Sequence, residues 1–191
     1  MAENRPSAAH LHADALRSLG TWTPPSGSQA ALAADYLAFL AAHPDACERG
    51  CAPGHLTASA IVFSHDLASV ALVLHGIVGA WLAPGGHLEP ADASLADAAR
   101  REVREELGIE VDLDPIPVSL DRHPITCRGY RSPTQHLDVR FAARAARDAD
   151  LTCSAESHRV AWWPLDGLPA LFDEVLELID LGRDRLAAPS A

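Results

Sequence analysis

Lysine is absent from this 191-residue sequence, because all 15 of its basic residues are arginine. The absence excludes mechanisms that need a lysine amine, such as a Schiff base or the lysine of a phosphate-binding P-loop. Acidic residues number 26, which gives a net charge of -11. A chain with this balance, and with no basic cluster longer than Arg100-Arg101, is repelled by nucleic-acid backbones and anionic membranes. We therefore predict no nucleic-acid partner and no membrane partner.

Long apolar runs are also missing. No stretch reaches the roughly 18 apolar residues that can span a membrane, and the polar start from Met1 to His10 lacks the apolar core of a signal peptide. We therefore expect a cytoplasmic protein. Only four cysteines occur, and in that compartment we expect them to be free thiols; they are Cys47, Cys51, Cys127 and Cys153.

What is present fits a folded chain, because 48% of the residues are hydrophobic. The length suits one globular domain plus an extension. Alanines, leucines and aromatic residues recur at helical spacing over 28–42, with Ser28 as the expected N-cap and Pro44 ending the helix. We expect this helix to lie outside the core of the main domain, in a helical N-terminal extension over residues 1–54.

From residue 55 the pattern changes to strands, and we predict one domain over residues 55–191. Runs of apolar and β-branched residues indicate its strands, which we expect over 56–64, 68–75, 80–82, 109–121, 135–144 and 158–163. Two further helices are expected, over 94–107 and 170–185. Strands, one central helix, more strands and a closing helix predict an α/β or α+β sandwich.

The helix expected over 94–107 carries three glutamates on one face. Glu102, Glu105 and Glu106 are spaced i, i+3 and i+4, and residues at this spacing are neighbours on a helix surface. Their mutual repulsion costs roughly a few tenths of a kcal/mol per pair, and a hard cation such as Mg²⁺ would replace it with coordination. The alternative is an ordinary charged face exposed to water, which the spacing alone does not exclude.

Turn-forming residues frame this helix. Ser94 with Asp97 resembles a capping box, and Gly108 suits the left-handed position after the last turn. Gly85 and Gly86 precede the helix and permit a tight turn with close backbone approach to a ligand. The whole segment resembles the signature of the Nudix hydrolase family, Gly-x5-Glu-x7-Arg-Glu-U-x-Glu-Glu-x-Gly-U, in which U is an apolar residue.

The match covers Gly86 and the complete run from Arg101 to Ile109, and weaker resemblance extends over roughly 55–185. The signature is altered in its front half. Asp92 stands in place of the first glutamate, and eight residues instead of seven separate it from Arg101. Because aspartate is shorter and one residue is inserted, we expect any departure in geometry to lie there.

The resemblance implies an α/β/α sandwich with a mixed sheet. It also implies hydrolysis of a phosphoanhydride bond that depends on Mg²⁺, with Mn²⁺ as the alternative ion. Glu102, Glu105 and Glu106 would be metal ligands, together with the backbone carbonyl of Gly85. Glu102 and Glu105 would also be catalytic, and Arg101 would orient a carboxylate.

Further candidates lie outside the helix. Glu156 is the candidate for a loop carboxylate that acts as general base, with an ordinary surface acid as the alternative. Gly86, His87 and His136 are candidates for substrate binding, and for each histidine a structural role is the alternative. The tryptophans at 162–163 could stack on a nucleobase. Strand alternation is expected to put only one of them inside, and core packing is the alternative role.

A second set of metal-binding residue types recurs every four positions, at His43, Cys47, Cys51 and His55. Two cysteines and two histidines suit zinc. However, prolines and a glycine between them break any continuous helix, and the spacing matches no common zinc finger. We interpret this segment as a connecting loop with incidental thiols.

The leading hypothesis is an active pyrophosphohydrolase with a small-molecule substrate of the nucleotide type. The alternative is a Nudix-like domain that binds a nucleotide without turnover, as a sensor or regulator. Three intact glutamates favour the enzyme, because a pure binding domain need not keep them all. No motif selects one substrate, and a homodimer stays open.

Overall fold

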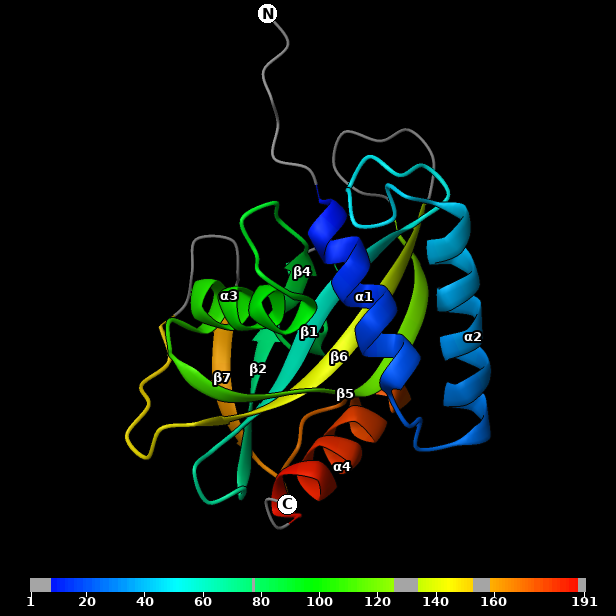
Figure 1. Ribbon diagram of the computed structural model, residues 1–191. Helices are drawn as coiled ribbons and strands as arrows, with labels where there is room; N and C mark the ends of the chain where they lie inside the picture. The colour runs from blue at the N-terminus through cyan, green and yellow to red at the C-terminus, as the bar shows by residue number, and fades with distance from the viewer. Residues whose placement is uncertain (1–7, 77, 126–133, 153–158, 189–191) are drawn as a thin grey trace, which may run out of the picture.

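The computed structural model describes residues 8–76, 78–125, 134–152 and 159–188. Figure 1 shows a central sheet with helices packed around it. The elements, in chain order, are α1 (Ala9–Thr21), α2 (Gly27–Ala42), β1 (His55–Phe63), β2 (Ser69–Leu74), β3 (Trp81–Leu82), β4 (Gly85–His87), α3 (Leu95–Leu107), β5 (Val111–Ile125), β6 (Thr134–Ala145), β7 (Arg159–Pro164) and α4 (Asp173–Ala187). Among the described residues, no helix has the length and apolar character to span a membrane.

The sheet has seven strands and is mixed. Its main order is β3-β2-β1-β6-β5, with β4 paired to β1 and β7 paired to β2. The central pair β1 and β6 is parallel and runs from His55 opposite His136 to Phe63 opposite Arg144, whereas the other pairs are antiparallel. The register of β5 shifts between Asp114 and Ser119. Each strand expected from the sequence overlaps an observed strand.

Helices cover both faces of this sheet. Side chains alternate between the faces along a strand, so Ala58 and Ala60 of β1 join a cluster with α1, α2 and α3. Ile61 and Phe63 of the same strand join a second cluster with α4. The arrangement confirms the expected α/β/α sandwich with a mixed sheet.

The N-terminal helices are part of the main core, so the expectation that the helix over 28–42 lies outside it was wrong. Tyr36 and Leu40 of α2 are fully buried within the larger cluster. The N-cap is Ser26 and not Ser28, because the Ser26 side chain accepts a hydrogen bond from the Gln29 amide. The boundary after residue 54 stays a prediction.

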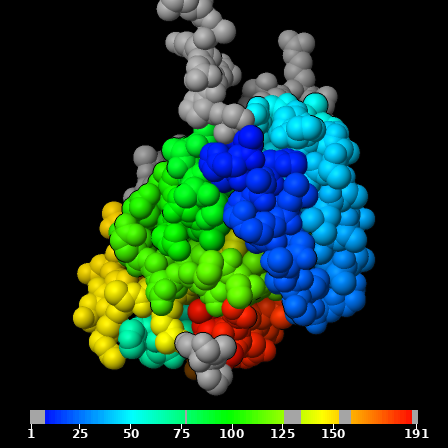
Figure 2. Space-filling model, viewed as in Figure 1, coloured from blue at the N-terminus to red at the C-terminus, as the bar shows by residue number. Residues whose placement is uncertain are grey.

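Helix α1 was not predicted, although its buried residues Leu11, Ala15 and Leu19 recur every four positions. In Figure 1 it lies between α3 and α2. The space-filling view in Figure 2 shows the surface of α1 (dark blue) against that of α3 and its preceding loop (green). The extension therefore contacts the segment that carries the glutamates.

Candidate active site

The acidic helix is α3, and its ends are capped as the sequence predicts. The Ser94 hydroxyl accepts a hydrogen bond from the Asp97 amide at 3.1 Å, and Gly108 adopts a left-handed φ of 70°. Val103 and Leu107 are completely buried and anchor the helix on the sheet. This anchoring fixes the rotation of the helix, and with it the direction of the three glutamates.

The glycine turn lies directly against these glutamates. It forms β4, in which Gly86 is opposite Ala58 of β1. A Cβ atom on Gly86 would lie 2.6 Å from Oε1 of Glu102, so any larger residue would displace that carboxylate. The amide of Gly85 donates a hydrogen bond to Oε2 of Glu106 at 3.0 Å. The glycine turn and α3 are therefore in direct contact, and position 86 has room only for glycine.

Arg101 ties the helix to the front half of the signature. Its Nε and Nη2 bind both oxygens of Asp92, at 2.9 and 3.1 Å. Nη2 also donates to the carbonyl of His87 at 2.8 Å. Nη1 bridges Glu102 and Glu105, at 2.9 and 3.0 Å. One guanidinium thus brings the turn and two of the candidate ligands together.

The inserted residue does not separate Asp92 from Arg101. Oδ2 of Asp92 accepts a hydrogen bond from the Glu89 amide at 2.7 Å, and the Asp92 amide donates to the Glu89 carbonyl at 3.0 Å. This turn directs the short aspartate side chain toward the arginine. The ion pair is well buried, since the side chains of Arg101 and Asp92 are only 12% and 3% exposed.

The environment of the glutamates differs from one to the next. Burial raises the pKa of Glu102 to about 7, because desolvation disfavours the ionised form more than the neighbouring Arg101 favours it. The side chain of Glu105, by contrast, is 53% exposed. Three carboxylates beside the backbone carbonyls of the glycine turn make a set of hard oxygen donors, which fits Mg²⁺ or Mn²⁺.

We predict that Mg²⁺ raises the unfolding temperature more at pH 8 than at pH 6. In metal-free protein the folded-state pKa of Glu102 is about 7 and its ordinary value is 4.5. Its contribution to stability is therefore present at acid pH and is lost as the pH rises through about 7. A cation binds the ionised form, so at pH 6 it must first displace a proton.

Thermal unfolding at both pH values, with and without Mg²⁺, measures this difference. The variant Glu102→Gln should lose most of the pH dependence of the Mg²⁺ effect. An equal gain at pH 6 and pH 8 in the unaltered protein would contradict the prediction.

Helix α1 braces the front of this site. Nε2 of His10 lies 2.7 Å from the carbonyl oxygen of Asp92. Oδ2 of Asp14 accepts a hydrogen bond from the Leu95 amide at 2.8 Å, where a carboxylate also interacts favourably with the helix dipole. These contacts were not predictable from the sequence, because the polar residues of a separate helix carry no motif.

We predict that Asp14→Ala costs about 1 kcal/mol, the usual effect of losing a helix-capping side chain. The unfolding temperature should then fall by roughly 2–4 °C. Asp35→Ala is the matched control, since Asp35 makes only an exposed ion pair with Arg122 at 3.4 Å among the contacts described. Equal unfolding temperatures for the two variants would show that the brace adds no stability.

The two histidines proposed from the sequence come together with a third. His55 is opposite His136 across β1 and β6, and His87 is opposite Thr57 across β4 and β1. Centroids of the three imidazole rings lie 4.9–5.0 Å apart. Burial lowers the pKa of His87 to about 4 and that of His136 to about 3, so both rings are neutral at pH 7.

This histidine cluster (His55, His87 and His136) lies on the other face of the sheet from the glutamates. A Cβ on Gly86 would point at Glu102, and the neighbouring residue in the strand, His87, points to the opposite side. His55 was missed as a partner, because the sequence places it near two cysteines and not near the turn.

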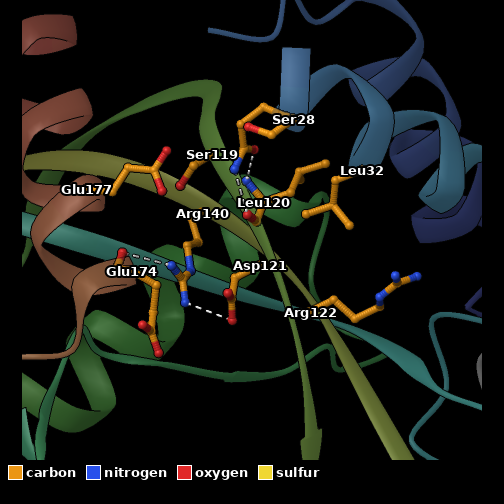
Figure 3. Close-up of a pocket in the computed structure, with 10 residues that line it drawn as sticks. Ser28, Leu32, Ser119, Leu120, Asp121, Arg122, Arg140, Glu174 and Glu177 are labelled. Carbon is orange, nitrogen blue, oxygen red and sulfur yellow. Dashed lines mark hydrogen bonds and ion pairs between the residues drawn. The ribbon is translucent and has the colours of Figure 1, made fainter. Parts of the chain in front are cut away.

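A cavity of about 350 Å³ lies between α2, the strands β5 and β6, and α4. Figure 3 shows the residues that line it. Its only buried cationic side chain among the described residues is Arg140. That guanidinium binds Asp121 at 3.0 Å, Asp138 at 3.1 Å and the Glu174 carbonyl at 3.1 Å. Because these partners already use the guanidinium, we assign the cavity no ligand.

Of the remaining candidates, Glu156 lies outside the described residues. Trp162 packs in the larger hydrophobic cluster and Trp163 in the smaller one, where the Trp163 and Trp81 ring centroids are 5.2 Å apart. Both side chains are partly buried and pack against the core, one in each cluster, whereas strand alternation was expected to put only one of them inside.

The four-residue zinc set does not form one group among the described residues. His43 and Cys51 lie with Asp45, whereas His55 belongs to the histidine cluster. Cys47 belongs to neither group. Cys47 and Cys51 are free thiols as expected, and Cys127 and Cys153 lie outside the described residues.

Comparison with known proteins agrees with this geometry. A family model for the NUDIX domain matches residues 54–180. A search of curated protein sequences found no significant match.

Solved structures with the same fold include several enzymes. A NUDIX-family hydrolase from Clostridium perfringens is 22% identical, with a TM-score of 0.53 over 69% of this chain and 97% of that chain. An ADP-ribose pyrophosphatase from Streptococcus suis is 21% identical, with a TM-score of 0.52 over 71% and 93%. An Ap4A hydrolase from C. elegans is 19% identical, with a TM-score of 0.51 over 69% and 97%.

Proposed function

Because this chain belongs to the Nudix family, we propose that it is a magnesium-dependent pyrophosphohydrolase that cleaves a phosphoanhydride bond in a nucleoside diphosphate linked to another group. The observation that carries the proposal is the single guanidinium of Arg101 that gathers Glu102 and Glu105 beside the glycine turn. A merely solvated acidic face needs neither the buried pair with Asp92 nor a glycine at position 86.

Glu102, Glu105 and Glu106 would hold Mg²⁺ together with the carbonyl of Gly85. When bound, the ion would neutralise phosphate charge and lower the pKa of the attacking water. The proton of that water would pass to a carboxylate, for which the half-exposed Glu105 is our first candidate and Glu156 the second.

Arg101 acts as a positioning residue, since its contacts hold two of the carboxylates in place. Gly86 would let substrate phosphates approach the backbone, because glycine has no side chain of its own. His87 and His136 face each other and His55, an arrangement that suits a different ligand. Names of similar proteins, an ADP-ribose pyrophosphatase and an Ap4A hydrolase, support a nucleotide substrate.

The alternative is a domain that binds such a nucleotide without turnover. It would not require the raised pKa of Glu102 or the paired contacts of Arg101. An activity panel separates the two functions. Purified protein with Mg²⁺ is offered nucleoside triphosphates, dinucleoside polyphosphates, nucleotide sugars, NADH and ADP-ribose, and release of phosphate or nucleotide is measured. Binding of a panel member without release would favour the sensor and overturn the enzyme.

A further inference from the structure

Three imidazoles converge at one end of the sheet. His87 on β4, His55 on β1 and His136 on β6 come from three strands that are hydrogen-bonded side by side. One ring nitrogen from each lies within 4.8 Å of the other two. Two of the three residues are buried in the sheet. Rigid neighbouring strands therefore hold the three rings close together before any ligand arrives.

We propose that His55, His87 and His136 bind one transition-metal ion of the Zn²⁺ type, at a site separate from the carboxylates of α3. Neutral imidazole is a preferred ligand of Zn²⁺, Co²⁺ and Ni²⁺, whereas Mg²⁺ prefers oxygen. Zinc–nitrogen distances of about 2.0–2.1 Å require the ring nitrogens to close slightly from their present spacing. Three histidines leave the fourth tetrahedral position open for water or another ligand.

The positive charge of one arginine near the histidine cluster opposes the binding of a cation there. The charge of Arg49 contributes to lowering the pKa of all three histidines, so it acts on the same space that the ion would occupy. A metal ion and an anion therefore respond in opposite ways to the loss of this charge. Replacing Arg49 by glutamine should tighten the binding of Zn²⁺, and it should weaken the binding of a phosphate.

The histidine cluster is also linked to the glycine turn by the sequence, because His87 belongs to both. His87 directly follows Gly86, and its carbonyl accepts a hydrogen bond from Arg101. An ion bound by the His87 ring would hold this residue from the face opposite the glutamates. The inference goes beyond the proposed hydrolysis and does not depend on it, because metal binding is measured without any substrate.

The test uses the full chain, prepared without a histidine tag and stripped of metal. Co²⁺ is added as a spectroscopic probe, since tetrahedral Co²⁺ absorbs strongly in the visible range, and Zn²⁺ is then titrated against it. We expect one tetrahedral Co²⁺ ion per chain. The variant Glu105→Gln with Glu106→Gln should keep the Co²⁺ spectrum, which separates this site from the carboxylate site.

His136→Ala and His55→Gln should each weaken Zn²⁺ binding by about 100-fold or more, given that even the loss of an outer-shell partner costs 10–100-fold. His87→Gln is the safer variant for folding, because His87 is only partly buried. His65→Gln is the matched control, since His65 is exposed in the turn between β1 and β2. Circular dichroism checks that each variant is folded.

Three outcomes would overturn the proposal. One is the absence of a tetrahedral Co²⁺ spectrum, and the second is its persistence in a folded His87→Gln protein. The third is weaker Zn²⁺ binding after Arg49→Gln, because removal of a positive charge beside the ion should tighten that binding. Tighter binding after Arg49→Gln, together with loss of binding in the histidine variants, would support it.

Discussion

Replacing Glu105 and Glu106 by glutamine should lower turnover by about 100-fold or more, with little change in fold. Amides keep the size of the side chains but lose the charge that, under the proposed function, would hold a divalent cation. Loss of an outer-shell partner of a metal site costs 10–100-fold, and loss of one transition-state donor costs about 100- to 1,000-fold. The loss of two proposed metal ligands should therefore lower turnover by at least about 100-fold.

Glu110→Gln is the matched control for this experiment. Glu110 is an acidic residue just after the same helix, its side chain is 70% exposed, and its described ion pair, with Arg104, spans 3.6 Å. Its replacement removes one charge without touching the site, so turnover should stay within about twofold. Equal effects of the control and the double variant would contradict the assignment of the glutamates.

Arg101→Ala should be the most destabilising single change at the site. It leaves Asp92, which is 3% exposed, as a buried carboxylate without its ion-pair partner. Breaking a buried pair in this way costs about 3–5 kcal/mol, which lowers the unfolding temperature of a chain of this size by roughly 6–20 °C. Arg101→Lys should recover only part of the loss, because an ammonium cannot bind both oxygens of Asp92 as a planar guanidinium does.

Arg104→Ala tests whether this loss comes from the buried geometry or merely from removing a positive charge on α3. Arg104 and its partner Glu110 are 53% and 70% exposed, and exposed pairs contribute less than about 1 kcal/mol. Thermal unfolding of the three variants gives the comparison. A fall as large for Arg104→Ala as for Arg101→Ala would show that the buried contacts add nothing.

The site was predictable where one local segment contains all of its parts. The capping residue Ser94, the glycine at 108 and the spacing of the glutamates are properties of consecutive residues, and the structure keeps all of them. The contact between Asp92 and Arg101, in the altered front half of the signature, could not be predicted, because it depends on the conformation of the loop before α3. The hydrogen bond from the Glu89 amide directs Asp92 to Arg101, and no spacing rule contains that turn.

Contacts between distant segments were not predictable. Asp14 caps α3 from 81 residues away in the chain, and His55 meets His136 only because β1 and β6 are paired in parallel. The same limit explains the error about α2. Its alanines, leucines and aromatic residues predict a helix but not the surface on which it packs. Only the tertiary structure shows that the Tyr36 hydroxyl donates a hydrogen bond to the Asp121 carbonyl in β5.

The central claim is that the glutamates of α3 support magnesium-dependent hydrolysis of a phosphoanhydride. Its most direct test is the turnover of metal-stripped protein as Mg²⁺ is added back, on whichever nucleotide the activity panel selects. We predict negligible turnover without Mg²⁺, saturable recovery with it, and no recovery in the variant that carries both Glu105→Gln and Glu106→Gln. Turnover that is independent of added Mg²⁺, or equal in that variant, would contradict the claim.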